Sequence, residues 1–236
     1  MKSLIICATQ RCGSTMLCED LTAAGIGRPN EWFHDWSSGQ KNWEEEFALV
    51  QKKGTGNGIF SAKVMANQVG AVDVRLSSFM QVEGSGKYRY FFNAFKDSFW
   101  IWNRRRDVLD QAISHVIAKQ RGIYHSIRNA EGFVPGAAAI ATKKLPDVVF
   151  DFDEIDRECK KIEAENAEWG RYFASHALEP LVVWYEDSID GSATNKLCEI
   201  FGREKSFNGK RNLVKMPSET NKRLRDQYVL EREKRQ

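Results

Sequence analysis

The residues best suited to binding a phosphate group lie near the start of the chain, in the run T-Q-R-C-G-S-T at residues 9–15. Gly13 permits a close approach of the backbone to a ligand, and Arg11 adds a permanent positive charge. Ser14 and Thr15 add hydroxyl donors. A loop of this kind binds anions when it joins a buried strand to a helix, because backbone N–H groups and the helix dipole then converge on one point. The same residues would also serve as a plain helix N-cap.

The flanking residues predict that strand and that helix. Residues 3–8, S-L-I-I-C-A, are short and almost continuously apolar, which is typical of a strand buried in a parallel sheet. From Ser14 the apolar residues recur at helical spacing, and Gly25 is a natural stop. The sequence therefore predicts a strand, a tight anion-binding loop and a helix.

A second candidate anion site follows the aromatic strand S-F-W-I-W-N at residues 98–103. Three arginines come next, and Asp107 can cap a helix that runs to about Arg121. Ser114 lies eight residues after Arg106, a little over two helical turns, so both side chains can face one ligand. A solvated arginine cluster with Ser114 as a filler is the alternative interpretation.

The remaining pattern predicts one three-layer α/β domain over residues 1–236, with a mostly parallel sheet and helices on both faces. Residues 122–150 have weak periodicity and several Gly and Pro, so we interpret them as an insertion. Further strands are expected at 59–64 and 180–186, and further helices at 41–53, 155–173 and 192–202.

Several longer runs resemble the bacterial trehalose 2-sulfotransferase-like family. They are I-C-A-T-Q-R-C-G-S-T-M-L-C-E-D-L, G-R-P-N-E-W-F, R-R-D-V-L-D-Q-A-I-S, E-N-A-E-W and W-Y-E-D, at residues 6–21, 27–33, 105–114, 165–169 and 184–187. The resemblance covers most of the chain and implies a P-loop-like sulfotransferase fold. It also implies transfer of a sulfuryl group from 3′-phosphoadenosine-5′-phosphosulfate (PAPS) to a hydroxyl.

The resemblance assigns roles to the residues of both anion sites. The 5′-phosphosulfate would be held by Arg11 and by the loop residues Cys12, Gly13, Ser14 and Thr15. The 3′-phosphate would be bound by Arg106 and Ser114, and Tyr185 would lie near the adenine. Cys12 stands where the family usually has Ser, so the loop would lose one hydroxyl while keeping its backbone donor.

The resemblance also suggests a general base. Glu31, in G-R-P-N-E-W-F, matches the family's proposed base, and an aromatic wall of Trp32 and Phe33 is expected to raise its pKa. His34, three residues away, is the competing base. Lys63 lies on an otherwise apolar strand, so its ammonium is expected to emerge at the sheet edge. There it would either contact sulfate or acceptor or simply extend into solvent from the strand end, and the sequence fits both equally well.

Trp32 and Phe33 are also candidates to bind a carbohydrate or glycolipid acceptor. The three tryptophans Trp32, Trp36 and Trp43 fit stacking on sugar faces and a core role equally well. Sulfuryl transfer requires no metal in principle.

The composition bears on metal sites, disulfides, the cellular compartment and the C-terminal segment. The five cysteines form no C-x-x-C pair, so neither a zinc site nor a disulfide framework is predicted, and we expect a cytoplasmic protein with no membrane span. Residues 203–236 hold 11 Lys and Arg against 5 Asp and Glu, a segment that we expect to be solvated rather than a lid.

Two alternative functions, a kinase and an RNA-binding protein, are also considered, and the sequence does not determine the oligomeric state. A small-molecule kinase using ATP is the runner-up, although the loop lacks the lysine of G-x-x-x-x-G-K-[ST]. An RNA-binding role is disfavoured because the basic segment lacks interleaved aromatic residues, so no nucleic-acid partner is expected. A homodimer remains open.

Overall fold

The structure is a computed structural model that describes residues 2–37, 39–127, 137–139, 146–204, 210–214 and 218–235. Its central sheet has the order β2-β3-β1-β4-β7. All neighbouring strands run parallel except the edge strand β2, which pairs antiparallel with β3. The bounds are β1 (Ser3–Ala8), β2 (Thr55–Gly56), β3 (Ile59–Met65), β4 (Phe99–Arg104) and β7 (Leu181–Trp184).

Strand β1 occupies the centre of this sheet, which explains its nearly continuous apolar sequence. Ile5 pairs with Ala62 of β3 on one side and with Trp100 of β4 on the other. Successive side chains of a strand point to opposite faces, so a strand covered on both faces must be apolar throughout. Residues 4–8 are accordingly fully buried.

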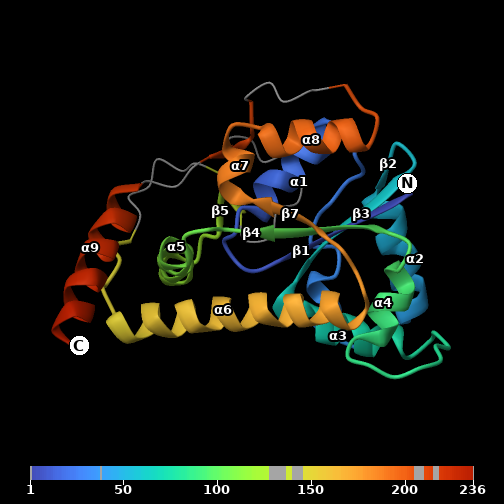
Figure 1. Ribbon diagram of the computed structural model, residues 1–236, viewed down its shortest axis with the longest axis horizontal. Coiled ribbons are helices and arrows are strands. Elements are labelled where there is room, and N and C mark those ends of the chain that lie inside the picture. Colours follow the sequence, from blue (N-terminus) through green and yellow to red (C-terminus); the bar gives the residue numbers. More distant parts are fainter. Residues whose placement is uncertain are drawn as a thin grey trace.

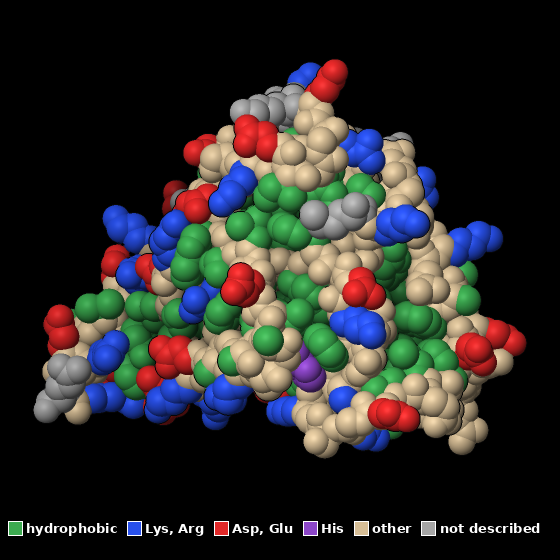
Figure 2. Space-filling model, turned by 45° about the vertical axis from the view of Figure 1, so that its right-hand side comes forward, with side chains coloured by type: hydrophobic (Ala, Val, Ile, Leu, Met, Phe, Trp, Pro, Cys, Tyr) green, Lys and Arg blue, Asp and Glu red, His purple; other side chains and the backbone are tan. Residues whose placement is uncertain are grey.

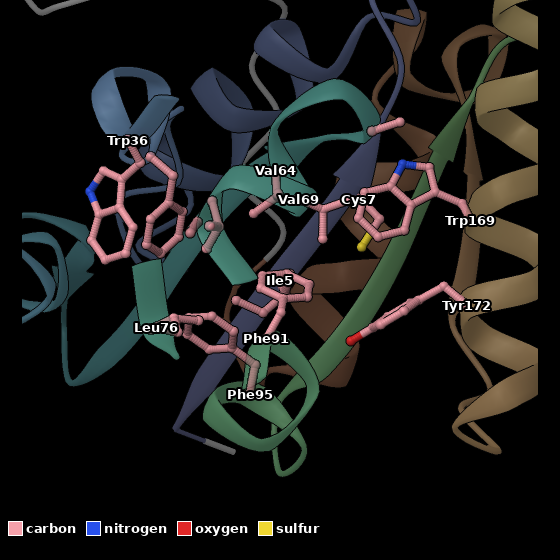
Figure 3. Packing of buried hydrophobic residues seen from close by; sticks show 14 of the residues in the cluster. Ile5, Cys7, Trp36, Val64, Val69, Leu76, Phe91, Phe95, Trp169 and Tyr172 are labelled. Atoms are coloured by element: carbon pink, nitrogen blue, oxygen red, sulfur yellow. The ribbon is translucent and has the colours of Figure 1, made fainter. Parts of the chain in front are cut away.

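Helices cover both faces of the sheet (Figure 1). One face packs against α1 (Ser14–Ala23) and α8 (Ser192–Ile200) through Leu4, Ile6, Leu17 and Leu197. The other face is covered by α3 (Ala66–Leu76), α4 (Arg89–Phe95) and α6 (Phe152–Ser175). Figure 3 shows Trp169 and Tyr172 of α6 projecting toward the sheet in this second cluster. The predicted three-layer α/β architecture is confirmed.

Helix α5 (Val108–Arg121) lies beside α6, and Asp107 caps it as predicted by accepting a bond from the Asp110 amide at 2.8 Å. Helix α9 (Ser218–Lys234) packs on α5, burying Leu224 and Tyr228 against Ile113 and Val116. The expectation that the basic segment 203–236 is merely solvated is therefore wrong for its described helix. Residues 205–209, 215–217 and 236 of this segment lie outside the described residues.

Other boundaries also differ from the predicted ones. The strand expected at 180–186 ends at Trp184, and Tyr185 begins α7 (Tyr185–Ile189). Helices α3 and α4 were not predicted. The described remainder comprises η1 (His34–Ser37), α2 (Trp43–Gly54) and a small sheet of β5 (His125–Ile127), β6 (Ala137–Ala139) and β8 (Leu213–Val214).

Within the expected insertion at 122–150, residues 128–136 and 140–145 lie outside the described residues. On the face in Figure 2, basic side chains are interspersed with acidic ones. No helix in the described ranges is long and apolar enough to cross a membrane.

Candidate active site

A cavity of about 630 Å³ lies where the parallel strands end. The loop after β1, the last residues of β3, the segment after β4 and the start of α7 all contribute to its wall. Helices α5 and α9 and strand β5 close its other sides. In open α/β sheets ligands bind in this position, at the carboxyl ends of the strands. Most of the predicted site residues therefore lie around one space.

The loop at residues 9–15 has the geometry predicted for it. Gly13 has a φ of 84°, and its carbonyl accepts the first bonds of α1 from Met16 and Leu17. Arg11 also adopts a left-handed φ of 62°, which is uncommon for a residue with a side chain. A Cβ atom at Gly13 would lie 2.3 Å from Cδ2 of Tyr185, so only glycine fits without displacing that ring.

Gln111, which the sequence analysis missed, holds this loop from α5. Its Nε2 donates to Thr9 Oγ1 at 2.9 Å and to the Gln10 carbonyl at 2.6 Å, and the side chain is fully buried. The sequence could have indicated this role, because a glutamine on the apolar face of a predicted helix is expected to be buried and buried polar groups need hydrogen-bond partners. These two bonds fix the backbone immediately before Arg11.

Arg11 faces the cavity and is partly buried there. Its Nε donates to Ser114 Oγ at 3.1 Å, and Nη1 donates to the Tyr124 carbonyl. Burial, assisted by the charge of Arg105, lowers the pKa of Arg11 to about 10. The guanidinium thus stays charged at neutral pH, and the structure brings Arg11 and Ser114 into direct contact.

Cys12 does not line the cavity. Its side chain is fully buried, with Sγ 3.7 Å from Asn103 Oδ1, and burial raises the pKa of the thiol. A serine hydroxyl in the same orientation would meet Asn103 rather than a ligand. The difference at position 12 therefore leaves the donors that face the cavity unchanged.

The three consecutive arginines divide between two sides of the chain. Arg104 and Arg106 both lie against the Trp184 ring, at 4.9 and 5.0 Å from its centroid. Alternate residues of an extended chain point the same way, so Arg105 points to the opposite side, into the cavity. There its guanidinium lies 4.8 Å from the Tyr185 ring centroid and 3.5 Å from Asp110 Oδ2.

The structure does not bring Arg106 to the cavity that Ser114 lines. The Arg106 side chain is 49% exposed and pairs with Asp187 at 3.0 Å and with Glu186 at 3.4 Å. Arg106 and Ser114 are eight residues apart as predicted, but of the three consecutive arginines it is Arg105 that lines the cavity with Ser114.

Lys63 and Glu31 form a buried pair at the floor of the cavity. Lys63 is 1% exposed, its Nζ lies 2.8 Å from Glu31 Oε1, and it donates to Thr15 Oγ1 at 2.9 Å. Gln68 donates to the other Glu31 oxygen at 3.0 Å. The ammonium of Lys63 therefore links the Glu31 carboxylate to the loop at residues 9–15.

The expected rise in the pKa of Glu31 is wrong. Burial does favour a higher pKa, but the charge and hydrogen bond of Lys63, the bond from Gln68 and the nearby His34 together outweigh burial. The pKa of Glu31 is lowered. Glu31 is therefore a carboxylate at neutral pH, ready to accept a proton but only a moderate base.

The aromatic residues next to Glu31 pack inward rather than lining the cavity. Phe33 is 1% exposed and contacts Trp36 edge-to-face, with ring centroids 4.9 Å apart. Trp36 and Trp43 belong to the same buried cluster, which settles their role as core. Trp32 packs at the edge of that cluster and donates its indole N–H to the Arg28 carbonyl. The assignment of Phe33 to acceptor binding is therefore wrong, and Trp32 does not reach the cavity.

His34 lies beside Glu31 but outside the cavity. Its side chain is 50% exposed, and Nδ1 is 3.8 Å from Glu31 Oε2. A second histidine, His125, lines the cavity with Nε2 3.4 Å from Thr15 Oγ1. Burial, reinforced by the charges of Arg11 and Lys63, lowers the pKa of His125 to about 3. Its sequence neighbourhood has no periodicity, so nothing signalled this position.

Basic side chains dominate the cavity wall. Six lysines and arginines line it against two acidic residues, Glu31 and Asp110. Arg211 is paired with Asp20 at 2.7 Å, and Arg225 with Asp107 and Asp110. Such an excess of cations favours an anionic ligand. The described residues include no group of three or more His, Cys, Asp or Glu side chains placed to hold a metal ion.

The family model described as Stf0 sulphotransferase matches residues 3–57 and 45–229. The chain belongs to the Stf0 sulphotransferase family. The two matched segments together cover most of the chain, including the loop at residues 9–15 and every element that lines the cavity. Comparison with curated proteins gives no match. Membership identifies an enzyme that transfers sulfate.

Proposed function

We propose that this sulfotransferase transfers the sulfuryl group of PAPS to a hydroxyl of a carbohydrate or glycolipid acceptor. The observation that carries the proposal is the cavity at the strand ends, which joins an anion-binding loop to a second set of cations. PAPS has two anionic ends, so a cavity with two cationic regions suits it better than a single phosphate site would.

In this proposal the loop binds the 5′-phosphosulfate. The backbone N–H groups of residues 13–15 and the positive end of α1 face the anion, with the Arg11 guanidinium and the Thr15 hydroxyl beside them. Arg105 and Ser114 then bind the 3′-phosphate, so Arg105 replaces Arg106 in the role expected from the sequence. Tyr185 contacts the adenine in this proposal, which is supported by the position of its ring next to Gly13 and Arg105.

Glu31 acts as the general base in the proposed reaction. The acceptor oxygen forms a bond to sulfur as the bond from sulfur to the 5′-phosphate oxygen breaks, the electron pair stays on that phosphate, and Glu31 takes the hydroxyl proton. Lys63 lies between Glu31 and Thr15, so its charge can stabilise the departing phosphate while it keeps the carboxylate ionised. The reducing cytoplasm is the proposed compartment, and a homodimer is compatible with the proposal.

Replacing Glu31 by glutamine tests this assignment. We expect Glu31→Gln to bind the product, 3′-phosphoadenosine 5′-phosphate (PAP), as wild type does. Turnover of labelled PAPS with a panel of sugar acceptors should fall by ~10²–10⁴-fold, the usual contribution of a general base. The matched control is His34→Gln, which changes the neighbouring exposed residue. A larger loss in His34→Gln than in Glu31→Gln would move the base to the histidine.

A further inference from the structure

Helix α9 forms one wall of the cavity, although it begins about 100 residues after α5 in the sequence. Asn221, Lys222 and Arg225 face the cavity from one side of the helix. An adjacent side of the helix carries Leu224 and Tyr228, which are buried in a cluster with residues of α5 and α6. Figure 1 shows α9 alongside α5, away from the central sheet. The packing therefore sets which side chains of α9 face the ligand.

Arg225 is fixed by two carboxylates at the start of α5. Its Nη1 lies 2.8 Å from Asp107 Oδ2 and 2.7 Å from Asp110 Oδ1. Asp110 also lies 3.5 Å from Arg105. Asp107 and Asp110 are thus already paired with arginines. These ion pairs connect α9 to the segment that carries Arg105.

Lys222 differs from the other basic residues of the wall. It lies one turn before Arg225, its side chain is exposed, and it has no hydrogen-bond or ion-pair partner within the described part of the chain. Thr220 contacts Arg121 near the end of α5, and Arg225 contacts Asp110 near its start. Lys222 lies between these two contacts in the sequence of α9, and it lines the same cavity as Ser114 of α5.

We infer that Lys222 of α9 completes the second anion site and binds a phosphate monoester held by Arg105 and Ser114. The inference rests on the proposed function, and it extends the nucleotide site to a helix that no sequence pattern assigned to it. The ligand is the 3′-phosphate of PAP or PAPS. Because Lys222 is exposed at the cavity wall, an approaching phosphate can reach it without displacing a protein partner.

Calorimetry with PAP and adenosine 5′-monophosphate (AMP) tests this inference, because the two ligands differ by the 3′-phosphate alone. We expect Lys222→Gln to weaken PAP binding by ~3–30-fold, the range for a charged hydrogen bond at an exposed site, and AMP binding by less than ~2-fold. The matched control is Lys234→Gln, which removes an exposed charge near the far end of the same helix and should change neither affinity.

Three outcomes would overturn the inference. Unchanged PAP affinity in Lys222→Gln would show that Lys222 does not touch the ligand. Equal weakening of PAP and AMP, or an equal effect in Lys234→Gln, would show that the lysine acts through the general charge of the protein. No PAP binding by wild type would instead refute the proposed function and this inference with it, so the two failures are distinguishable. Thermal unfolding of both variants should match wild type, since neither side chain is buried.

Discussion

Of the adjacent residues Arg105 and Arg106, only Arg105 lines the cavity, so the two should differ sharply in their effect on nucleotide binding. Arg105 is 16% exposed and lines the cavity together with Ser114, whereas Arg106 is half-exposed and pairs with acidic residues of α7. Losing a charge-assisted bond to phosphate costs ~1.5–3 kcal/mol, which corresponds to ~10–150-fold in affinity. Arg105→Ala should therefore weaken PAP binding by that factor and reduce the preference for PAP over AMP to the same extent.

Arg106→Ala is the matched comparison. Solvent and salt screen exposed ion pairs, so this variant should lose little stability and keep wild-type affinity for PAP within ~2-fold. Titration calorimetry of both variants with PAP and AMP at fixed salt gives the four affinities needed. If Arg106→Ala loses the preference for PAP while Arg105→Ala keeps it, the eight-residue spacing was the correct guide and our assignment of Arg105 is wrong.

Three further results are expected. Gly13→Ala should reduce PAP affinity by more than ~10-fold, because the new Cβ would collide with the Tyr185 ring in a backbone conformation that disfavours side chains; near-normal binding would show that the loop is not the phosphate site. Phe33→Leu should cost ~1–3 kcal/mol of unfolding free energy in a denaturant titration and leave the KM for acceptor unchanged, whereas a raised KM would restore its substrate role. Between about pH 3 and 6.5 the unfolded chain binds more protons at His125 than the folded chain, so the free energy of unfolding should fall as the pH is lowered through this window. His125→Asn should flatten that part of a plot of Tm against pH, and an unchanged plot would contradict the low pKa of His125.

The sequence predicted the parts of the fold that carry strong local signals. Three elements lie where they were expected: strand β1, the loop after it and the Asp107-capped helix α5. In each of them the local sequence, an apolar run, a glycine or a capping residue, favours one type of local structure. Helix α9 was not predicted, since its sequence is largely polar and only tertiary packing buries Leu224 and Tyr228.

The sequence predicted those site residues whose role follows from residue type and position in a loop. It did not predict those whose role depends on the direction in which the side chain points. Arg11 and Thr15 lie in the cavity as expected, because a loop at a strand end has a fixed direction. The choice between Arg105 and Arg106 depends on the pleat and on Trp184, which comes from a strand about 80 residues away. The pKa of Glu31 depends on Lys63 of β3, whose contact with Glu31 no spacing reveals.

Calorimetric titration of the wild-type protein with PAP and, separately, with ATP and Mg²⁺ tests the proposed donor most directly. We expect PAP to bind with a micromolar or lower Kd and its affinity to fall as salt rises, because both phosphates meet charged groups. ATP with Mg²⁺ should bind much more weakly. No heat with PAP together with tight binding of ATP and Mg²⁺ would refute PAPS as the donor and favour a kinase.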